Sequence, residues 1–486
     1  MNVSYYSIAA GLTLAIFALW MYLRSVTFAA KLVRAHQQIA LGLARDQLTG
    51  LLTLYGFDAV LGRWSQKVDR GGGSFTLLYV AVDDFGLIND AYGRESGDAL
   101  LVEVANRLAK CTGEKTEICH AAPGEFALIT NGGIVMGRNA TERLKAVFAE
   151  VFECDLMQTH LLTSIGMAVY PEHGTRSMLL GNAALAMRKV KRSGGNGICQ
   201  YEPKMSAEVR EQTLLVHDLR MALELGQFEL YFQPKIDVIS LQITALEALL
   251  RWNHPTRGNV SPAVFIPLAE QCGVVGSIGN WVIEEACATA AHWRKGGMRM
   301  RVAVNISGCQ MKEEDLVDRI EATLKRHGIQ PGRFTCEITE SVAMEDTKLT
   351  KMTFEKMRRA GVHVSIDDFG TGYSSLATLR QLPVSELKID KSFISDLENS
   401  ESAQAIVKAI VNMATALNLH IVAEGVETLG QQNLLIDLGC HELQGYLFSV
   451  PISAEEIEHL VNSSQHQGDV MFRPSLFQTT APADFS

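Results

Sequence analysis

HVSIDDFG, residues 363–370, decides the fold of the second half of the chain. It reads as a short β-strand that stops at two adjacent carboxylates, Asp367 and Asp368. Similar β-rich segments flank it, and most of them also stop at a carboxylate or an amide. They are FELYFQP (228–234), ITALEALLRW (243–252), RVAVNIS (301–307), FTCEITE (334–340), ELKIDKSF (386–393), HIVAEGVE (420–427) and LQGYLFS (443–449). Stretches with helical apolar spacing lie between most of them, so the pattern predicts an α/β fold, a (β/α)8 TIM-like barrel.

Oxygen-bearing side chains lie at or near the ends of these segments. They are Glu247, Asn305, Glu337, Asp367, Asp368 and Glu424. The active site of a (β/α)8 barrel gathers at the C-terminal ends of its strands, so we expect these side chains to converge on one mouth. Hard oxygen ligands without clustered His or Cys favour Mg2+ or Mn2+ over zinc. Two adjacent aspartates can serve two different ions, and a pair of ions suits phosphodiester hydrolysis. The alternative for any single acid is a solvated loop residue.

An ordered series of motifs gives these residues a family context. Glu247-Ala248-Leu249, followed by Leu250 and Arg251, resembles the signature of EAL domains, the phosphodiesterases that linearise cyclic di-GMP. The series also contains QPK at Gln233, VNIS at Val304, EITE at Glu337, DDFGTGYSSL at Asp367, LKID at Leu387, AEGVE at Ala423 and QGYLFS at Gln444. A three-letter motif alone is not specific, whereas the whole order is. The resemblance implies hydrolysis of cyclic di-GMP to the linear dinucleotide pGpG.

The resemblance also implies a role for each matching residue. Two Mg2+ or Mn2+ ions are expected on the oxygen ligands named above, none of which is substituted. Lys388 matches the catalytic lysine that holds the attacking water and offsets developing charge. The positions that match substrate contacts are Gln233, Arg251, Asp390 and Gln444. A guanidinium suits a phosphate because its forked donors pair with two oxygens.

Two further acids, Glu340 and Glu427, match catalytic-site residues that fix the metal ligands and a mobile loop through hydrogen bonds. The loop corresponds to residues 368–376, which contain Gly370 and Gly372. In EAL domains this loop links the metal site to dimerisation. A homodimer is therefore expected.

The middle of the chain, residues 46–201, has a separate α+β pattern. DQLTGLLTLYGF (46–57), FTLLYVAVDDFGLINDAYGRESGDALL (75–101) and LLTSIGMAVYPEHG (161–174) resemble GGDEF domains, which as diguanylate cyclases make cyclic di-GMP. This resemblance implies a sheet flanked by helices, like the palm of nucleotide cyclases.

The motif that defines this second family is altered. Residues 122–126 read Ala-Pro-Gly-Glu-Phe where the family has Gly-Gly-Asp-Glu-Phe or a close variant. Ala122 adds a Cβ and Pro123 removes an N–H, whereas the family's glycines let the backbone approach the nucleotide. Gly124 replaces an acidic metal ligand, which leaves Asp83 as a possible ligand. The family's inhibitory RxxD is also absent, because residues 113–116 read Gly-Glu-Lys-Thr. We expect an inactive cyclase domain.

Asn89 and Asp98 keep the identities that GGDEF domains use to contact guanine. They make GTP a possible effector of the barrel. The alternative is a purely structural or dimerising domain.

The beginning of the chain differs from the rest. Residues 3–23 carry no charge, and a stretch of about 21 residues is long enough to cross a bilayer. Arg24, Lys31, Arg34 and Arg45 follow this stretch, which places its C-terminal side in the cytoplasm by the positive-inside rule. The pattern predicts one transmembrane helix in the bacterial inner membrane, with both domains cytoplasmic. A cleavable signal peptide and a buried helix are the alternatives.

The connecting segments are short. Residues 24–45 form an expected linker helix, whose apolar residues suit either a short coiled coil or an ordinary amphipathic connector. The EAL domain is expected over residues 207–462. The tail, residues 463–486, is rich in Ser, Gln, Thr and Pro and is expected to be disordered.

Composition excludes some classes of function. A net charge of −10 argues against broad nucleic-acid binding, which depends on clustered Lys and Arg. The cysteines are scattered without a CxxC pair, so reduced thiols are expected, with disulfides as the alternative. Two function classes stay open, a membrane-tethered cyclic di-GMP hydrolase and a non-catalytic cyclic di-GMP receptor that signals through the linker.

Overall fold

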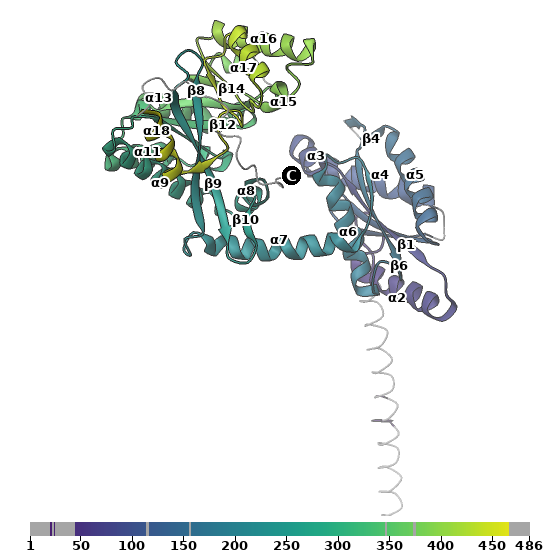
Figure 1. Cartoon of the computed structure of the whole chain (residues 1–486). Coiled ribbons are helices and arrows are strands. Elements are labelled where there is room, and N and C mark those ends of the chain that lie inside the picture. Colours follow the sequence, from purple (N-terminus) through teal and green to yellow (C-terminus); the bar gives the residue numbers. More distant parts are fainter. Residues whose placement is uncertain are drawn as a thin grey trace, which may run out of the picture. The chain divides into compact units, whose positions relative to one another are not determined.

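The computed structural model describes residues 20, 21, 24, 44–112, 116–154, 157–345, 348–372 and 376–465. The chain divides into two compact units between Glu211 and Gln212. Figure 1 labels many of the helices and strands of both units. Helix α7 (Pro203–Ala222) contains the division.

A five-stranded sheet in the order β2-β3-β1-β6-β7 forms the centre of the first unit. The strands are β1 (Phe75–Val82), β2 (Glu117–Ala122), β3 (Glu125–Asn131), β6 (Thr163–Tyr170) and β7 (Ile198–Gln200). Two short strands, β4 (Phe152–Cys154) and β5 (Met157–Thr159), pair separately. The helices are α2 (Leu54–Gly71), α3 (Phe85–Tyr92), α4 (Arg94–Thr112), α5 (Ile134–Ala149) and α6 (Arg176–Arg192).

Helices cover both faces of this sheet. Successive side chains of a strand point to opposite faces, and every residue of β1 is buried. Leu78 and Val80 pack in one apolar cluster with residues of α4 and α5. Leu77 and Tyr79 pack in another with residues of α2 and α6. The sheet flanked by helices confirms the predicted architecture of the middle domain.

The altered motif forms the turn between β2 and β3. Ala122 ends β2, Glu125 begins β3, and Pro123-Gly124 connects them. Gly124 has a φ of +74°, in the left-handed region that favours glycine. A Cβ at this position would lie 2.9 Å from the Phe85 ring, so the turn also requires glycine because any side chain would clash with Phe85.

A closed eight-stranded barrel forms the second unit, which confirms the predicted closed barrel. Its strands are β8 (Phe228–Asp237), β9 (Ile243–His254), β11 (Arg301–Asn305), β12 (Phe334–Thr339), β13 (His363–Phe369), β14 (Glu386–Ile389), β15 (His420–Ala423) and β16 (Glu442–Leu443). Short strands β10 (Gly258–Val260) and β17 (Ile452–Ser453) extend β9 and β8. From β9 to β16, neighbouring barrel strands pair in parallel.

The barrel departs from a regular (β/α)8 arrangement at its first strand. Strand β8 pairs antiparallel with both β9 and β16. The reason lies in the connection: residues 238–242 make a tight turn, and a parallel crossover needs a much longer link. The side chain of Asp237 closes this turn by accepting the backbone N–H of Ser240 at 2.7 Å.

Glu247 also differs from expectation, because it lies inside its strand and not at the end. Strand β9 pairs with β11 only from Ala245 to Ala248. The rest of β9 continues in antiparallel pairing with β8 and β10, up to His254. Glu247 is therefore near the end of the part of β9 that belongs to the barrel.

Helices alternate with the later barrel strands and cover their outer face. They are α8 (Pro262–Gln271), α9 (Val275–Lys295), α10 (Gly308–Met311), α11 (Leu316–His327), η1 (Pro331–Arg333), α12 (Glu340–Ala343), α13 (Lys348–Ala360), α14 (Leu376–Leu379), α15 (Lys391–Ile394), α16 (Glu401–Ala416), α17 (Leu429–Leu438) and α18 (Ala454–Gln465). Their buried apolar residues form one cluster with those of the strands. Helix α18 continues past the expected domain boundary at residue 462.

The segments predicted to anchor and connect the domains lie largely outside the described residues. The predicted membrane helix, residues 3–23, is described only at residues 20 and 21, and the linker only at residues 24, 44 and 45. Within the described part of the chain, no helix is long and apolar enough to span a bilayer. Residues 466–486 of the predicted tail are not described.

Candidate active site

Strand alternation places polar side chains inside the barrel. In β14, Leu387 and Ile389 belong to the apolar cluster, whereas Glu386 and Lys388 occupy the alternate positions. Both are buried, and Lys388 is 1% exposed. In β8, Gln233 and Lys235 are buried in the same alternating way. A buried charge needs a partner, so these positions identify the polar interior of the barrel.

The ammonium of Lys388 is surrounded by carboxylates. Its Nζ lies 2.5 Å from Glu424 Oε1 and 2.9 Å from Glu337 Oε2. It also lies 3.1 Å from Asp367 Oδ1 and 3.3 Å from Glu247 Oε2. Four strands or strand ends thus direct acids at one lysine, as the sequence predicted for the mouth of the barrel.

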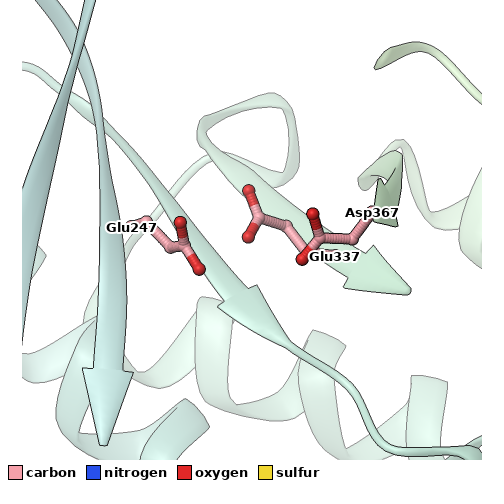
Figure 2. Close-up of side chains that lie close together, drawn as sticks. All are labelled: Glu247, Glu337 and Asp367. Carbon is pink, nitrogen blue, oxygen red and sulfur yellow. The ribbon is translucent and has the colours of Figure 1, made fainter. Parts of the chain in front are cut away.

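These acids form two overlapping groups, each compact enough to hold a cation. Oxygens of Glu247, Glu337 and Asp367 lie within 4.8 Å of one another, and Figure 2 shows the three carboxylates converging from different strands. Oxygens of Asp367, Asp368 and Glu424 form a second group with the same limit. Asp367 belongs to both groups. Adjacent groups that share a carboxylate are suited to two neighbouring metal ions.

The charges of this cluster are not balanced. Burial, opposed in part by Lys388, raises the pKa of Glu424 to about 8. Burial and neighbouring carboxylates also raise the pKa values of Glu247 and Asp367. A raised pKa means that the ionised carboxylate is unfavourable at its site. Added cations would remove this penalty, and oxygen donors suit Mg2+ or Mn2+, so the donor set fits divalent ions.

A second layer of charges, beneath the first, is balanced, because Lys235 and Arg301 pair with Glu386 and Glu442. Lys235 Nζ lies 2.7 Å from Glu337 Oε1 and 2.7 Å from Glu386 Oε1. Arg301 lies 2.7 Å from Glu442 and 3.5 Å from Glu386. Burial disfavours the ionised form of Glu337, but Lys235 and Lys388 outweigh it and lower its pKa to about 2. Glu337 therefore joins the balanced layer to the unbalanced one.

Two glutamines lie beside Glu247. Gln444 donates to Glu247 Oε2 at 2.6 Å and to Gln233 Oε1 at 3.0 Å. Gln233 in turn donates to the carbonyl oxygen of Ser449 at 3.1 Å. On the other side, Asn305 donates to Glu247 Oε1 at 2.8 Å. The structure thus brings the predicted substrate contacts Gln233 and Gln444 next to the predicted metal ligands.

Arg251 lies on the same face of β9 as Glu247, further from the barrel centre. Its guanidinium stacks 5.4 Å from the centre of the Tyr231 ring, and burial lowers its pKa. Asp390 caps helix α15 by accepting the backbone N–H of Ser392 at 3.0 Å. The charge of Asp390 contributes to the raised pKa of Asp368, after the larger effect of burial. Both predicted substrate contacts therefore lie around the mouth.

The two predicted supporting acids behave differently. Glu340 is buried and accepts the backbone N–H groups of Gly370 at 2.6 Å and Gly372 at 3.4 Å. Through these hydrogen bonds it holds the start of the loop that follows the predicted metal ligands of β13. Glu427 is exposed, and its backbone N–H donates to Gln431 Oε1 at 2.7 Å.

In the first unit, both carboxylate oxygens of Asp83 accept hydrogen bonds from within the protein. One oxygen accepts the Ser164 hydroxyl and the other accepts the backbone N–H of Asn196, each at 2.8 Å. Asn89 and Asp98 lie on successive helices, α3 and α4, and the Asn89 side chain packs against Gly97. Asp98 is exposed.

The sequence reasoning missed Lys235, Glu386, Arg301 and Glu442. The QPK motif predicts a role for Gln233 but none for Lys235. The available signal was the alternation of Gln233 with Lys235 in β8, which places both on one face of the strand.

Comparison with protein families agrees with this geometry. The family model "EAL domain" matches residues 216–451, and the model "Diguanylate cyclase, GGDEF domain" matches residues 43–197. The chain belongs to the GGDEF–EAL family. The barrel is its EAL domain, and the sheet of the first unit, with its flanking helices, is its GGDEF domain.

Individual relatives span both domains. The chain is 40% identical over 437 residues to the bifunctional diguanylate cyclase/cyclic di-GMP phosphodiesterase MucR of Pseudomonas aeruginosa, covering 89% of this chain and 64% of that protein. It is 32% identical over 427 residues to the cyclic di-GMP phosphodiesterase PdeR of Escherichia coli, covering 87% and 64%. The chain therefore spans slightly less than two thirds of these curated relatives.

A solved structure is also similar. The EAL enzyme Bd1971, in its cAMP- and cyclic-di-GMP-bound form, is 28% identical, with a TM-score of 0.51. The match covers 70% of this chain and 82% of that chain.

Proposed function

We propose that the EAL domain hydrolyses cyclic di-GMP to linear pGpG with two divalent ions. The observation that carries the proposal is the pair of carboxylate groups that share Asp367 around Lys388. Named relatives with the same two domains are cyclic di-GMP phosphodiesterases, which supports the choice of substrate.

The carboxylates of both groups, together with Asn305, would hold the ions. When bound, Mg2+ or Mn2+ would polarise a water molecule and neutralise charge on the scissile phosphodiester. Water adds to phosphorus, one P–O bond of the ring breaks, and the released ribose oxygen takes up a proton. The protein's own contribution is to orient these groups in a site enclosed by the barrel.

Lys388 would position the attacking water and offset charge that develops on the phosphate. Its pKa is raised because four carboxylates outweigh its burial, so it keeps its proton. It therefore acts as a fixed positive charge and donor. Arg251, at the edge of the mouth, suits a phosphate oxygen pair of the substrate. Gln233, Gln444 and Asp390 would contact the nucleotide.

The test is incubation of the purified full-length chain with cyclic di-GMP, with Mn2+ or with EDTA, followed by chromatography for pGpG. We expect pGpG only with metal. Tight binding of cyclic di-GMP without any pGpG would instead establish the receptor function.

We further propose that the GGDEF domain makes no cyclic di-GMP and serves as a regulatory or dimerising module. Gly124 supplies no ligand, and both oxygens of Asp83 are already bonded within the protein. GTP is the proposed effector, through Asn89 and Asp98. A homodimer is proposed on the resemblance of residues 368–376 to the dimerisation-linked loop of EAL domains.

Residues 3–23 are proposed to anchor the chain in the bacterial inner membrane, with both domains in the cytoplasm. The uncharged stretch and the basic residues after it support this proposal.

A further inference from the structure

Lys235 connects the two charged layers of the barrel. It is 1% exposed and belongs to β8, whereas its partners Glu337 and Glu386 belong to β12 and β14. Strand β8 is not a neighbour of either strand in the barrel. The ammonium therefore reaches across the interior and binds the opposite wall, with both contacts at 2.7 Å.

The contact with Glu337 fixes which oxygen faces the metal ligands. Lys235 donates a hydrogen bond to Glu337 Oε1, while Lys388 donates to Glu337 Oε2 at 2.9 Å. Lys388 also contacts Asp367 and Glu247, so Oε2 is the oxygen directed at the cluster. Rotation of the Glu337 carboxylate would break the short contact with Lys235.

Glu386 holds the other side of Lys235. Glu337 and Glu386 are level with each other in the barrel, since each pairs with Ser365 of β13. Among the described residues, Arg301 forms its ion pairs with Glu386 and Glu442, neither of which is a predicted metal ligand. Lys235 is thus the member of the balanced layer that touches the metal site directly.

We propose that Lys235 is a positioning residue, which orients Glu337 so that Oε2 is presented to a divalent ion. The inference rests on the proposed metal-dependent function and adds a residue that does not itself bind metal or substrate. Partners of this kind hold a ligand in place through hydrogen bonds, and their loss typically lowers metal affinity about 10- to 100-fold.

The test measures Mn2+ affinity of the full-length chain by electron paramagnetic resonance of free Mn2+, without cyclic di-GMP. Lys235→Met keeps the stem and removes the ammonium, and we expect about 10- to 100-fold weaker binding. Arg301→Met is the matched control, because it removes a cation of the same layer that does not touch Glu337. It should bind Mn2+ like the wild type, even where it lowers the melting temperature.

A double-mutant cycle tests whether Lys235 acts through Glu337. In a Glu337→Gln background, Lys235→Met should cause no further loss of Mn2+ affinity, because the group it orients is already changed. A merely structural lysine would lower the affinity by the same factor in both backgrounds.

Lys235→Met leaves Glu386 with less compensation, and it is destabilised for that reason. If it does not fold, Lys235→Met/Glu386→Gln replaces it, and the expected loss of Mn2+ affinity is the same. Wild-type affinity in either folded variant, or an equal loss in Arg301→Met, overturns the proposal. Wild-type protein that binds Mn2+ without hydrolysing cyclic di-GMP contradicts the proposed function alone, whereas wild-type protein that binds no Mn2+ overturns both.

Discussion

Glu247→Gln separates the chemistry of the carboxylate cluster from its packing. Glutamine keeps the volume of the side chain and removes one of the charges around Lys388. In the protein, Glu247 Oε1 accepts from Asn305 at 2.8 Å. Glu247 Oε2 accepts from Gln444 at 2.6 Å and from Lys388 at 3.3 Å.

The hydrogen bonds can survive the substitution. The Asn305 amide can turn over, so that its oxygen accepts from the new NH2 group, while the new carbonyl oxygen accepts from Gln444 and Lys388. Burial and the charge of Glu337 raise the pKa of Glu247, so its negative charge is unfavourable in the ion-free protein. We expect the ion-free variant to melt no lower than the wild type.

The rate of hydrolysis, unlike the melting temperature, should fall. An amide is a weaker metal ligand than a carboxylate, and bound metal ions contribute several kcal/mol to such reactions. A loss of about 4 kcal/mol corresponds to about a 10³-fold lower rate. The assay follows pGpG formation with Mn2+, and thermal unfolding is measured with EDTA.

Glu355→Gln provides a control for this prediction. Glu355 lies on α13 at the surface, where it pairs with Arg358 and Arg359, and it should leave turnover unchanged. Metal-dependent turnover near the wild-type rate in Glu247→Gln would contradict the assignment of the site. A large fall in the ion-free melting temperature would contradict the charge argument.

The remaining predictions separate roles within the chain. Lys388→Ala should lower kcat much more than it weakens cyclic di-GMP binding, and Arg251→Ala should mainly raise KM; equal losses of affinity in both would contradict this division. Purified protein given GTP and Mg2+ should form no cyclic di-GMP, and any GTP binding seen by calorimetry should weaken in Asn89→Ala; product formed from GTP would contradict the loss of cyclase chemistry. The chain should stay in the membrane fraction through a carbonate wash, with a C-terminal reporter active in the cytoplasm; a soluble periplasmic product would identify residues 3–23 as a signal peptide.

Much of the barrel was predictable because most of its strands show an alternation of apolar residues and a carboxylate or amide end within a few residues. HVSIDDFG shows alternation and an acidic end, and it forms β13. The antiparallel direction of β8 was also open to prediction, since residues 238–242 cannot form a crossover helix. The segment 243–252 likewise predicted that β9 continues past Glu247, but not that only Ala245 to Ala248 pair with β11 in the barrel.

Some residues of the site could likewise be predicted from the sequence, and others could not. The carboxylates that meet Lys388 follow from strand ends, which the sequence displays. The role of Lys235 depends on Glu337 and Glu386, which are far away in the chain, and no local pattern reveals such a contact. Glu427 is a different case: its motif matches the family and its side chain is exposed, so its supporting role stays a prediction.

Charge compensation distinguishes the two units of the chain. Asp83 directly follows β1, and Asp367 lies near the end of β13, but a hydroxyl and a backbone N–H satisfy both oxygens of Asp83. Asp367 instead shares one ammonium with three other acids, two of them buried, and burial raises its pKa. A carboxylate that is fully hydrogen-bonded within the protein stabilises the fold. A cluster of acids with too little positive charge around it instead favours binding of cations. This contrast, more than the motifs alone, supports the proposals of metal-dependent chemistry in the EAL domain and of a structural or regulatory role for the GGDEF domain.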